Sequence, residues 1–166
     1  MAKVNFKGSP VQLSGELPEK GVYAPDFGGV KGDLTVSHLS DYRGRKVVLN
    51  IFPSLDTAVC ASSVRKFNQL ASSLENTVVL CISKDLPFAQ SRFCTVEGLD
   101  DVVPLSLFRC GCFSDKYGLE MIDGPLKGLY ARAVVIVDED GKLIYSQLVD
   151  EITDEPDYDS ALAVLK

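Results

Sequence analysis

One stretch decides the fold: residues 46–82 have the sequence KVVLNIFPSLDTAVCASSVRKFNQLASSLENTVVLCI. Val47–Phe52 is a nearly continuous apolar run that ends at Pro53, as expected for a strand buried on both faces. Within Phe67–Leu74, apolar residues recur at i, i+3, i+4 and i+7, which indicates one face of an amphipathic helix. Thr77–Ile82 repeats the pattern of a buried strand. The stretch therefore predicts two parallel strands joined by a helix.

The sequence on either side extends this order to a thioredoxin-like α/β fold. Asp138-Glu139-Asp140-Gly141 separates two apolar runs, which indicates an antiparallel hairpin. We expect a central mixed sheet flanked by helices, preceded by an N-terminal β-hairpin, in a single domain over residues 1–166. The other expected elements are a hairpin of Lys3–Phe6 and Val11–Leu13, a loop or short strand near glycines 28, 29 and 32, a helix over Pro87–Glu97, a strand at Val102–Leu107, a helical turn near Phe113–Tyr117, strands at Ala131–Val137 and Leu143–Leu148, and a final helix with Tyr158, Ala161, Leu162 and Leu165 on one face.

Composition excludes several classes of protein. The chain has 17 Lys and Arg residues against 23 Asp and Glu residues, a net charge of −6. This acidic balance argues against binding to nucleic acid or to anionic membrane surfaces, which requires basic clusters. No apolar run approaches the ~20 residues that span a bilayer, and Met1–Leu13 lacks the apolar core of a secretory signal. With five cysteines and no short secreted framework, we expect a cytoplasmic protein with free or redox-active thiols.

Cys60 is a candidate reactive thiol. It follows Pro53 by seven residues and lies at the start of the predicted helix. Unpaired backbone N–H groups and the positive end of the helix dipole favour a thiolate there. The end of a central strand is also where open α/β sheets place their chemistry. The position alone suits a small buried apolar residue equally well.

The other cysteines differ in their surroundings. Cys81 falls within a buried strand, where nothing stabilises an anion, so a structural role is expected. Cys94 lies late in the second predicted helix and is expected to be partly exposed. Cys110 and Cys112 flank Gly111, and the local pattern gives them no role. Since cysteines two residues apart seldom form a comfortable disulfide, we expect these two not to pair.

Residue inventory disfavours several chemistries for Cys60. A cysteine hydrolase needs an imidazole base, and the single histidine, His38, lies in a polar segment typical of a turn or helix start. A tyrosine-phosphatase loop needs five residues between Cys and Arg, whereas Cys60 and Arg65 are separated by four. A zinc site or a dithiol oxidoreductase is disfavoured because no C-x2-C is present.

Thiolate chemistry without a general base remains, and it suits a substrate with a weak O–O bond. Such a site needs donors that orient the peroxide and stabilise the leaving alkoxide. Thr57 lies one helical turn before Cys60, so its hydroxyl can enter the same pocket. Arg132, at the start of the predicted strand Ala131–Val137, is the candidate cation, although sequence alone favours a surface ion pair for it.

The motif Pro53-x3-Thr57-x2-Cys60 matches the active-site signature of the peroxiredoxins. The blocks LNIFPSLDTAVCASSVRKFNQLA, TVVLCISKDLPFAQSRFC and DGPLKGLYARAVVIVD resemble the bacterial thiol peroxidases, the atypical two-cysteine peroxiredoxins, over essentially the whole chain. The resemblance implies that Cys60 attacks the peroxide, Pro53 shields the pocket, Thr57 hydrogen-bonds thiolate and peroxide, and Arg132 stabilises the thiolate and polarises the O–O bond.

The resemblance also assigns Cys94 as the resolving cysteine, which forms an intramolecular disulfide with Cys60 that thioredoxin then reduces. It implies a homodimer that reduces hydrogen peroxide and alkyl or lipid hydroperoxides without a metal or organic cofactor. Because a disulfide needs Cα atoms within about 7 Å and each thiol belongs to its own predicted helix, we expect a helical Cys60 when reduced and local unwinding when oxidised.

Two alternatives use the same residues. A redox sensor would signal through Cys60 oxidation without turning over, and an inactive scaffold would keep only the fold. Cys110 and Cys112 lie outside the family motif, so either residue could be idle, capture the oxidised Cys60, or pair between subunits.

Overall fold

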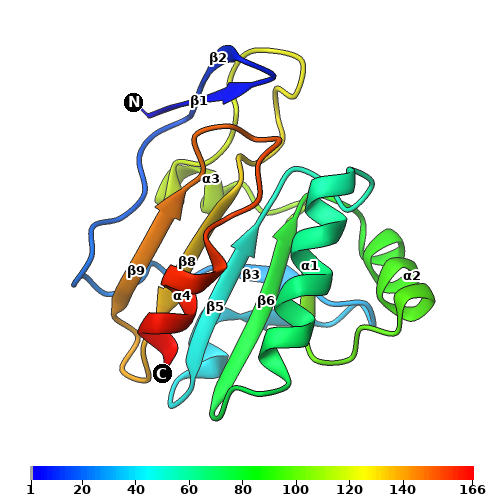
Figure 1. The fold of residues 1–166 in the computed structure, drawn as a ribbon, viewed down its shortest axis with the longest axis vertical. Coiled ribbons are helices and arrows are strands. Elements are labelled where there is room, and N and C mark those ends of the chain that lie inside the picture. The colour runs from blue at the N-terminus through cyan, green and yellow to red at the C-terminus, as the bar shows by residue number, and fades with distance from the viewer. Residues whose placement is uncertain (1) are drawn as a thin grey trace.

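The computed structural model describes residues 2–166, and these form a seven-stranded mixed sheet and a separate two-stranded hairpin (Figure 1). The sheet has the order β4-β3-β7-β6-β5-β8-β9; β5, β6 and β7 are parallel, and the other pairs are antiparallel. Its strands are β3 (Gly28–Val30), β4 (Val36–His38), β5 (Lys46–Ile51), β6 (Thr77–Ser83), β7 (Val103–Ser106), β8 (Ala133–Val137) and β9 (Leu143–Leu148).

Successive side chains along the central strands point to opposite faces of the sheet, which divides the core into two layers. One layer contains Val48 and Val79 together with the inner faces of α1 and α4, and the other contains Leu49 and Leu80 together with α3. In Figure 1, α1 and α4 lie in front of the sheet and α2 lies beside α1 at its edge. The helices are α1 (Ala58–Ala71), α2 (Pro87–Glu97), α3 (Cys112–Tyr117) and α4 (Tyr158–Leu165), with a 3-10 turn, η1, at Leu39–Tyr42.

The two helices that carry Cys60 and Cys94 are anchored very differently. Helix α1 buries Cys60, Val64 and Phe67 at i, i+4 and i+7 against the sheet. Helix α2 has an almost even distribution of apolar residues and buries only Pro87 and Gln90. Since buried apolar area is what holds a helix to its neighbours, α2 is the less firmly attached of the two.

The register between β5 and β8 places Arg132 at the same end of the sheet as the start of α1. Strand β8 runs antiparallel to β5 with Ala133 opposite Ile51, so Arg132 lies beside the carboxyl end of β5. The chain leaves β5 through the Pro53–Thr57 turn and enters α1. Above this end lies the hairpin of β1 (Lys3–Phe6) and β2 (Ser9–Gln12), as Figure 1 shows.

The structure confirms the predicted fold, with element bounds that differ from the expected ones by a few residues. The glycine-rich segment forms β3, and β4 is a further edge strand that the sequence did not predict. His38 ends β4 immediately before η1. No helix within residues 2–166 combines the length and apolar character needed to cross a membrane.

Candidate active site around Cys60

Cys60 lies in the first turn of α1, which begins after the N-cap residue Thr57. Its side chain is fully buried against the sheet. The Arg132 guanidinium approaches it from β8 and donates a hydrogen bond from Nη2 to Cys60 Sγ at 3.1 Å. The structure therefore brings together the predicted nucleophile and the predicted cation, which are 72 residues apart in the chain.

Arg132 is a buried cation, not part of a surface ion pair. It is 1% exposed, and its Nε donates to the Ile152 carbonyl at 3.0 Å. Among residues 2–166, no carboxylate forms an ion pair with it. A buried charge without a counter-charge costs several kcal/mol, and the Cys60 sulfur is the side-chain acceptor that the structure places against this guanidinium. The second amino group, Nη1, is buried without a hydrogen-bond partner and is a free donor at the same place.

A cavity of about 400 Å³ leads to this guanidinium. Pro53 and Thr57 line it, as does Arg132, so the structure groups these predicted residues around one space. The Thr57 hydroxyl donates to the Ser54 carbonyl at 3.0 Å and not to Cys60, which leaves its oxygen free to accept. Most of the remaining wall is apolar: the other lining residues are Phe6, Lys7, Ala58, Val59, Leu126, Ile152 and Thr153.

Comparison with known proteins identifies the family. The Redoxin family model matches residues 19–162. The chain belongs to the redoxin family. This redoxin is 57% identical to the thiol peroxidase of Corynebacterium glutamicum over 165 residues, 99% of each chain.

Solved structures agree with this assignment. A peroxiredoxin-like protein from Aquifex aeolicus is 41% identical, covers 99% of this chain with 96% of its own, and superimposes with a TM-score of 0.94. A thiol peroxidase from Chromobacterium violaceum, 22% identical, shares the fold with a TM-score of 0.90 over 98% and 94% of the two chains. The comparisons confirm the resemblance to thiol peroxidases, the thioredoxin-like fold and the enzyme class, a thiol-dependent peroxidase.

The redoxin holds Cys60, Cys81 and Cys94 as free thiols. Cys94 is half-buried in α2; burial, and secondarily the charge of Asp100, raise its pKa above the usual value. Cys81 is buried in β6, where burial and then the charge of Cys94 raise its pKa far enough to keep it a thiol. Helical Cys60 and Cys94 match the arrangement expected of the reduced state.

The expectation that Cys110 and Cys112 do not pair is wrong: they form a disulfide. Gly111 adopts a helical conformation (φ −78°, ψ −17°) as the N-cap of α3, and this tight turn brings the two Cα atoms to 5.6 Å. That separation lies within the range that disulfides need. A glycine between two cysteines was the local signal for such a turn.

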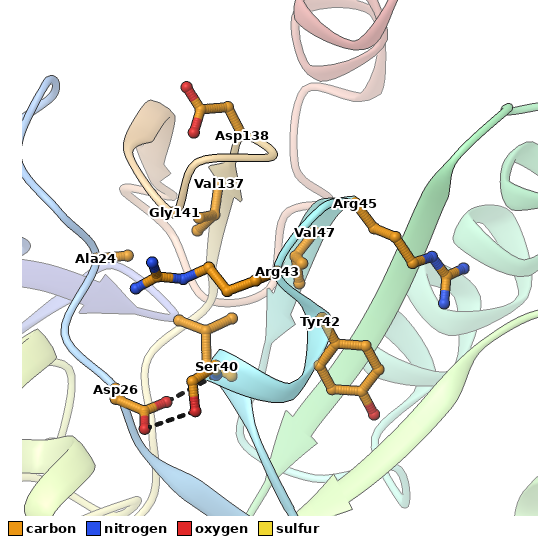
Figure 2. Close-up of a pocket in the computed structure, with 11 residues that line it drawn as sticks. Ala24, Asp26, Ser40, Tyr42, Arg43, Arg45, Val47, Val137, Asp138 and Gly141 are labelled. Carbon is orange, nitrogen blue, oxygen red and sulfur yellow. Dashed lines mark hydrogen bonds between the residues drawn. The ribbon is translucent and has the colours of Figure 1, made fainter.

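A second hollow shares no lining residue with the cavity beside Arg132. Figure 2 shows this hollow, in which the Asp26 carboxylate accepts hydrogen bonds from the backbone and hydroxyl of Ser40. It has room for only about 10 Å³ and no cysteine lines it, so it holds at most one water. His38 lies on the exposed edge strand β4 and contacts Asp41, not a cysteine. Within residues 2–166 no cluster of metal-ligating side chains is present.

Glu151 is a site residue that the sequence did not single out. Its carboxylate accepts hydrogen bonds from the backbone N–H groups of Gly8 (2.8 Å) and Lys7 (3.1 Å), and from the backbone N–H and the hydroxyl of Thr153. It thereby fastens the turn of the β1–β2 hairpin to the segment whose Ile152 carbonyl receives Arg132. The sequence offered only one signal, an acidic run between 150 and 159, which suggested helix capping; Asp157 performs that role.

The Glu151 contacts predict a pH dependence of the hairpin. Hydrogen bonds from the Thr153 and Gly8 backbones lower the pKa of Glu151 to about 2. Because the folded pKa lies below the usual value near 4.5, the stabilisation is complete above that value and disappears as pH falls towards 2. We expect protection of the hairpin amides from hydrogen exchange, relative to that of β5, to fall in this window. In Glu151→Gln the hairpin amides should exchange faster at neutral pH and lack the acid step; an acid step retained in that variant would contradict the assignment.

Proposed function

We propose that this redoxin reduces hydrogen peroxide and alkyl or lipid hydroperoxides through a sulfenic acid on Cys60. The observation that carries the proposal is the 3.1 Å contact between the buried Arg132 Nη2 and Cys60 Sγ. The guanidinium supplies a counter-charge for the thiolate, and the free Nη1 supplies a donor for a peroxide oxygen. The largely apolar cavity suits a hydroperoxide with a hydrocarbon tail.

The first step is a two-electron oxidation of sulfur. The Cys60 thiolate attacks the terminal O–H oxygen of the hydroperoxide, the S–O bond forms as the O–O bond breaks, and Cys60 becomes a sulfenic acid. The leaving alkoxide, or hydroxide from hydrogen peroxide, takes up a proton from solvent and departs as an alcohol or water. Arg132 stabilises both the attacking anion and the charge that develops on the leaving oxygen. The oxygen of Thr57 is free to accept a hydrogen bond from the peroxide O–H, and Pro53 forms part of the cavity wall.

The second step forms a disulfide with Cys94. The Cys94 sulfur attacks the sulfenic acid, an S–S bond forms, and water leaves. This requires α2 to open, which its shallow burial supports: Phe88 and Val96 are 66% and 79% exposed. Opening also relieves the burial that raises the pKa of Cys94, so the exposed thiol ionises more readily.

We further propose that thioredoxin, or a dithiol protein of that kind, returns both cysteines to thiols by thiol–disulfide exchange, and that the working enzyme is a cytoplasmic homodimer. The deciding experiment is steady-state peroxide consumption coupled to thioredoxin, its reductase and NADPH. Continuous turnover supports the enzyme. One equivalent consumed per subunit, followed by a halt, supports the sensor instead, and a Cys60 no faster than an ordinary thiol supports the inactive scaffold.

Cys94→Ser provides a separate prediction. With the resolving thiol removed, the variant should consume about one equivalent of peroxide per subunit and then stop under thioredoxin coupling. Cys81→Ser, which removes another buried thiol, should continue to turn over. Mass spectrometry checks the assignment on Cys94→Ser protein that is fully reduced first, which opens the Cys110–Cys112 disulfide, and then oxidised with peroxide. A Cys60 disulfide to Cys110 or Cys112 would move the resolving role to that residue.

A further inference from the structure

Asp85, in the loop between β6 and α2, joins two segments that are distant in the sequence. Its Oδ1 accepts a hydrogen bond from the Ser54 hydroxyl at 2.7 Å, and its Oδ2 accepts one from the Leu55 backbone at 2.8 Å. Both donors belong to the turn that precedes α1 and Cys60. A half-buried carboxylate therefore fastens the active-site turn to the segment that precedes α2.

Side-chain hydrogen bonds also connect the Asp85 carboxylate to α2. Asp85 Oδ2 also accepts from the Ser83 hydroxyl at 2.7 Å, and that hydroxyl receives a hydrogen bond from the buried Gln90 Nε2 at 3.1 Å. Gln90 lies one helical turn before Cys94 on α2. Its amide donates as well to the Leu105 carbonyl of β7. The hydrogen bonds thus form one path from the turn before Cys60 to the helix of Cys94.

On the other side, the path reaches the cavity. The Ser54 hydroxyl bound by Asp85 also accepts a hydrogen bond from the Asp56 backbone, at 3.2 Å. The Ser54 carbonyl receives both the backbone N–H and the hydroxyl of Thr57. Pro53 and Thr57 both line the cavity. Because Ser54 directly follows Pro53 and binds Thr57, the position of Ser54 determines where both residues lie.

We propose that Asp85 is a positioning residue that holds the Pro53–Thr57 turn against the start of α2 while the enzyme is reduced, and that its release controls how fast Cys60 and Cys94 meet. The proposal rests on the proposed function. With Asp85 in place, the turn keeps Pro53 and Thr57 set for the peroxide. Disulfide formation requires α2 to open and the start of α1 to loosen, so contacts that hold the turn before α1 to the start of α2 oppose it.

Asp85→Ala is the direct test, because it removes both oxygens from the three donors. Stopped-flow measurements separate the two steps: we expect Cys60 oxidation by peroxide to slow at least tenfold and disulfide formation from the sulfenic acid to accelerate at least threefold. Hydrogen exchange at residues 54–60 and 85–90 should increase. Asp85→Glu, which keeps a carboxylate, should recover part of both rates.

Asp56→Ala is the matched control, since this carboxylate belongs to the same turn but its side chain is 77% exposed and reaches Arg92 only at 3.9 Å. Both of its rates should stay within about twofold of wild type. If Asp85→Ala does not fold, Ser54→Ala is the substitute, because it removes the hydrogen bond from the Ser54 hydroxyl to Asp85. It should slow Cys60 oxidation and accelerate disulfide formation, each by a smaller factor than Asp85→Ala.

Opposite changes in the two rates support the proposal, because general damage to the site would slow both. Equal slowing of both steps, or no change in either, overturns it. The proposed function fails on a different observation, a wild-type protein that does not turn over peroxide. Unchanged hydrogen exchange in Asp85→Ala overturns the positioning role whatever the activity.

Discussion

Arg132→Met is expected to slow oxidation of Cys60 by peroxide by about 100- to 1,000-fold, the usual loss when one donor to a developing oxyanion is removed. Methionine fills a similar volume without charge or N–H donors, so the protein keeps its packing. It loses the hydrogen bond to Cys60 Sγ and the unpartnered Nη1 together. Single-turnover stopped-flow with excess peroxide, at a fixed pH, measures the rate directly.

Two variants bracket this result. Arg132→Lys keeps the charge, but an ammonium group does not reproduce the fork that donates to Ile152 and Cys60 at once, so an intermediate rate is expected. Arg65→Met removes an exposed guanidinium from α1, where its partner is Glu97, and should leave the rate within twofold. An Arg132→Met enzyme within threefold of wild type would show that this guanidinium does not stabilise the transition state.

The strand–helix–strand core was predictable because its signals are local. Buried parallel strands form continuous apolar runs, and the apolar positions of α1 repeat at helical spacing over a few turns. The position of Cys60 follows from the same stretch, since α1 begins two residues before it. Nothing in that stretch requires a residue from another part of the chain.

The role of Arg132 was not predictable in this way. Its burial depends on the antiparallel register of β8 on β5, which sets Ala133 opposite Ile51. Sequence alone favoured a surface ion pair, because a single arginine before a strand carries no information about the neighbouring strand. The family resemblance supplied the assignment, and the register now supplies its physical reason.

The position of the hairpin over the active site was likewise not predictable from sequence. Lys3–Phe6 was predicted as a strand, but its contact with the cavity depends on Glu151, which binds the hairpin turn from the far end of the chain. Likewise, the Cys110–Cys112 disulfide depends on one backbone conformation at Gly111. Long-range hydrogen bonds and individual backbone angles are the features that a pattern of residue types leaves undetermined.

Cys60→Ser is expected to reduce peroxide consumption to the background of the buffer and also to destabilise the fold. Serine is neutral, so it leaves the buried Arg132 guanidinium without the thiolate that the proposed mechanism places beside it. Removing one partner of a buried charged hydrogen bond costs about 1–3 kcal/mol. Urea denaturation of the reduced proteins, with equal m-values in all variants, measures this difference in the free energy of unfolding.

A double-mutant cycle separates that pairing from the loss of the sulfur itself. If the thiolate and guanidinium stabilise each other, Cys60→Ser combined with Arg132→Met should be more stable than the sum of the single changes predicts, by about 1–3 kcal/mol. Cys81→Ser combined with Arg132→Met serves as the control, because the buried thiol of Cys81 accepts its hydrogen bond from the neutral amide of Asn50. There the changes should add within about 0.5 kcal/mol. Additivity in both pairs would mean that Cys60 is a neutral thiol in the folded protein, and the peroxidase mechanism would lose its nucleophile.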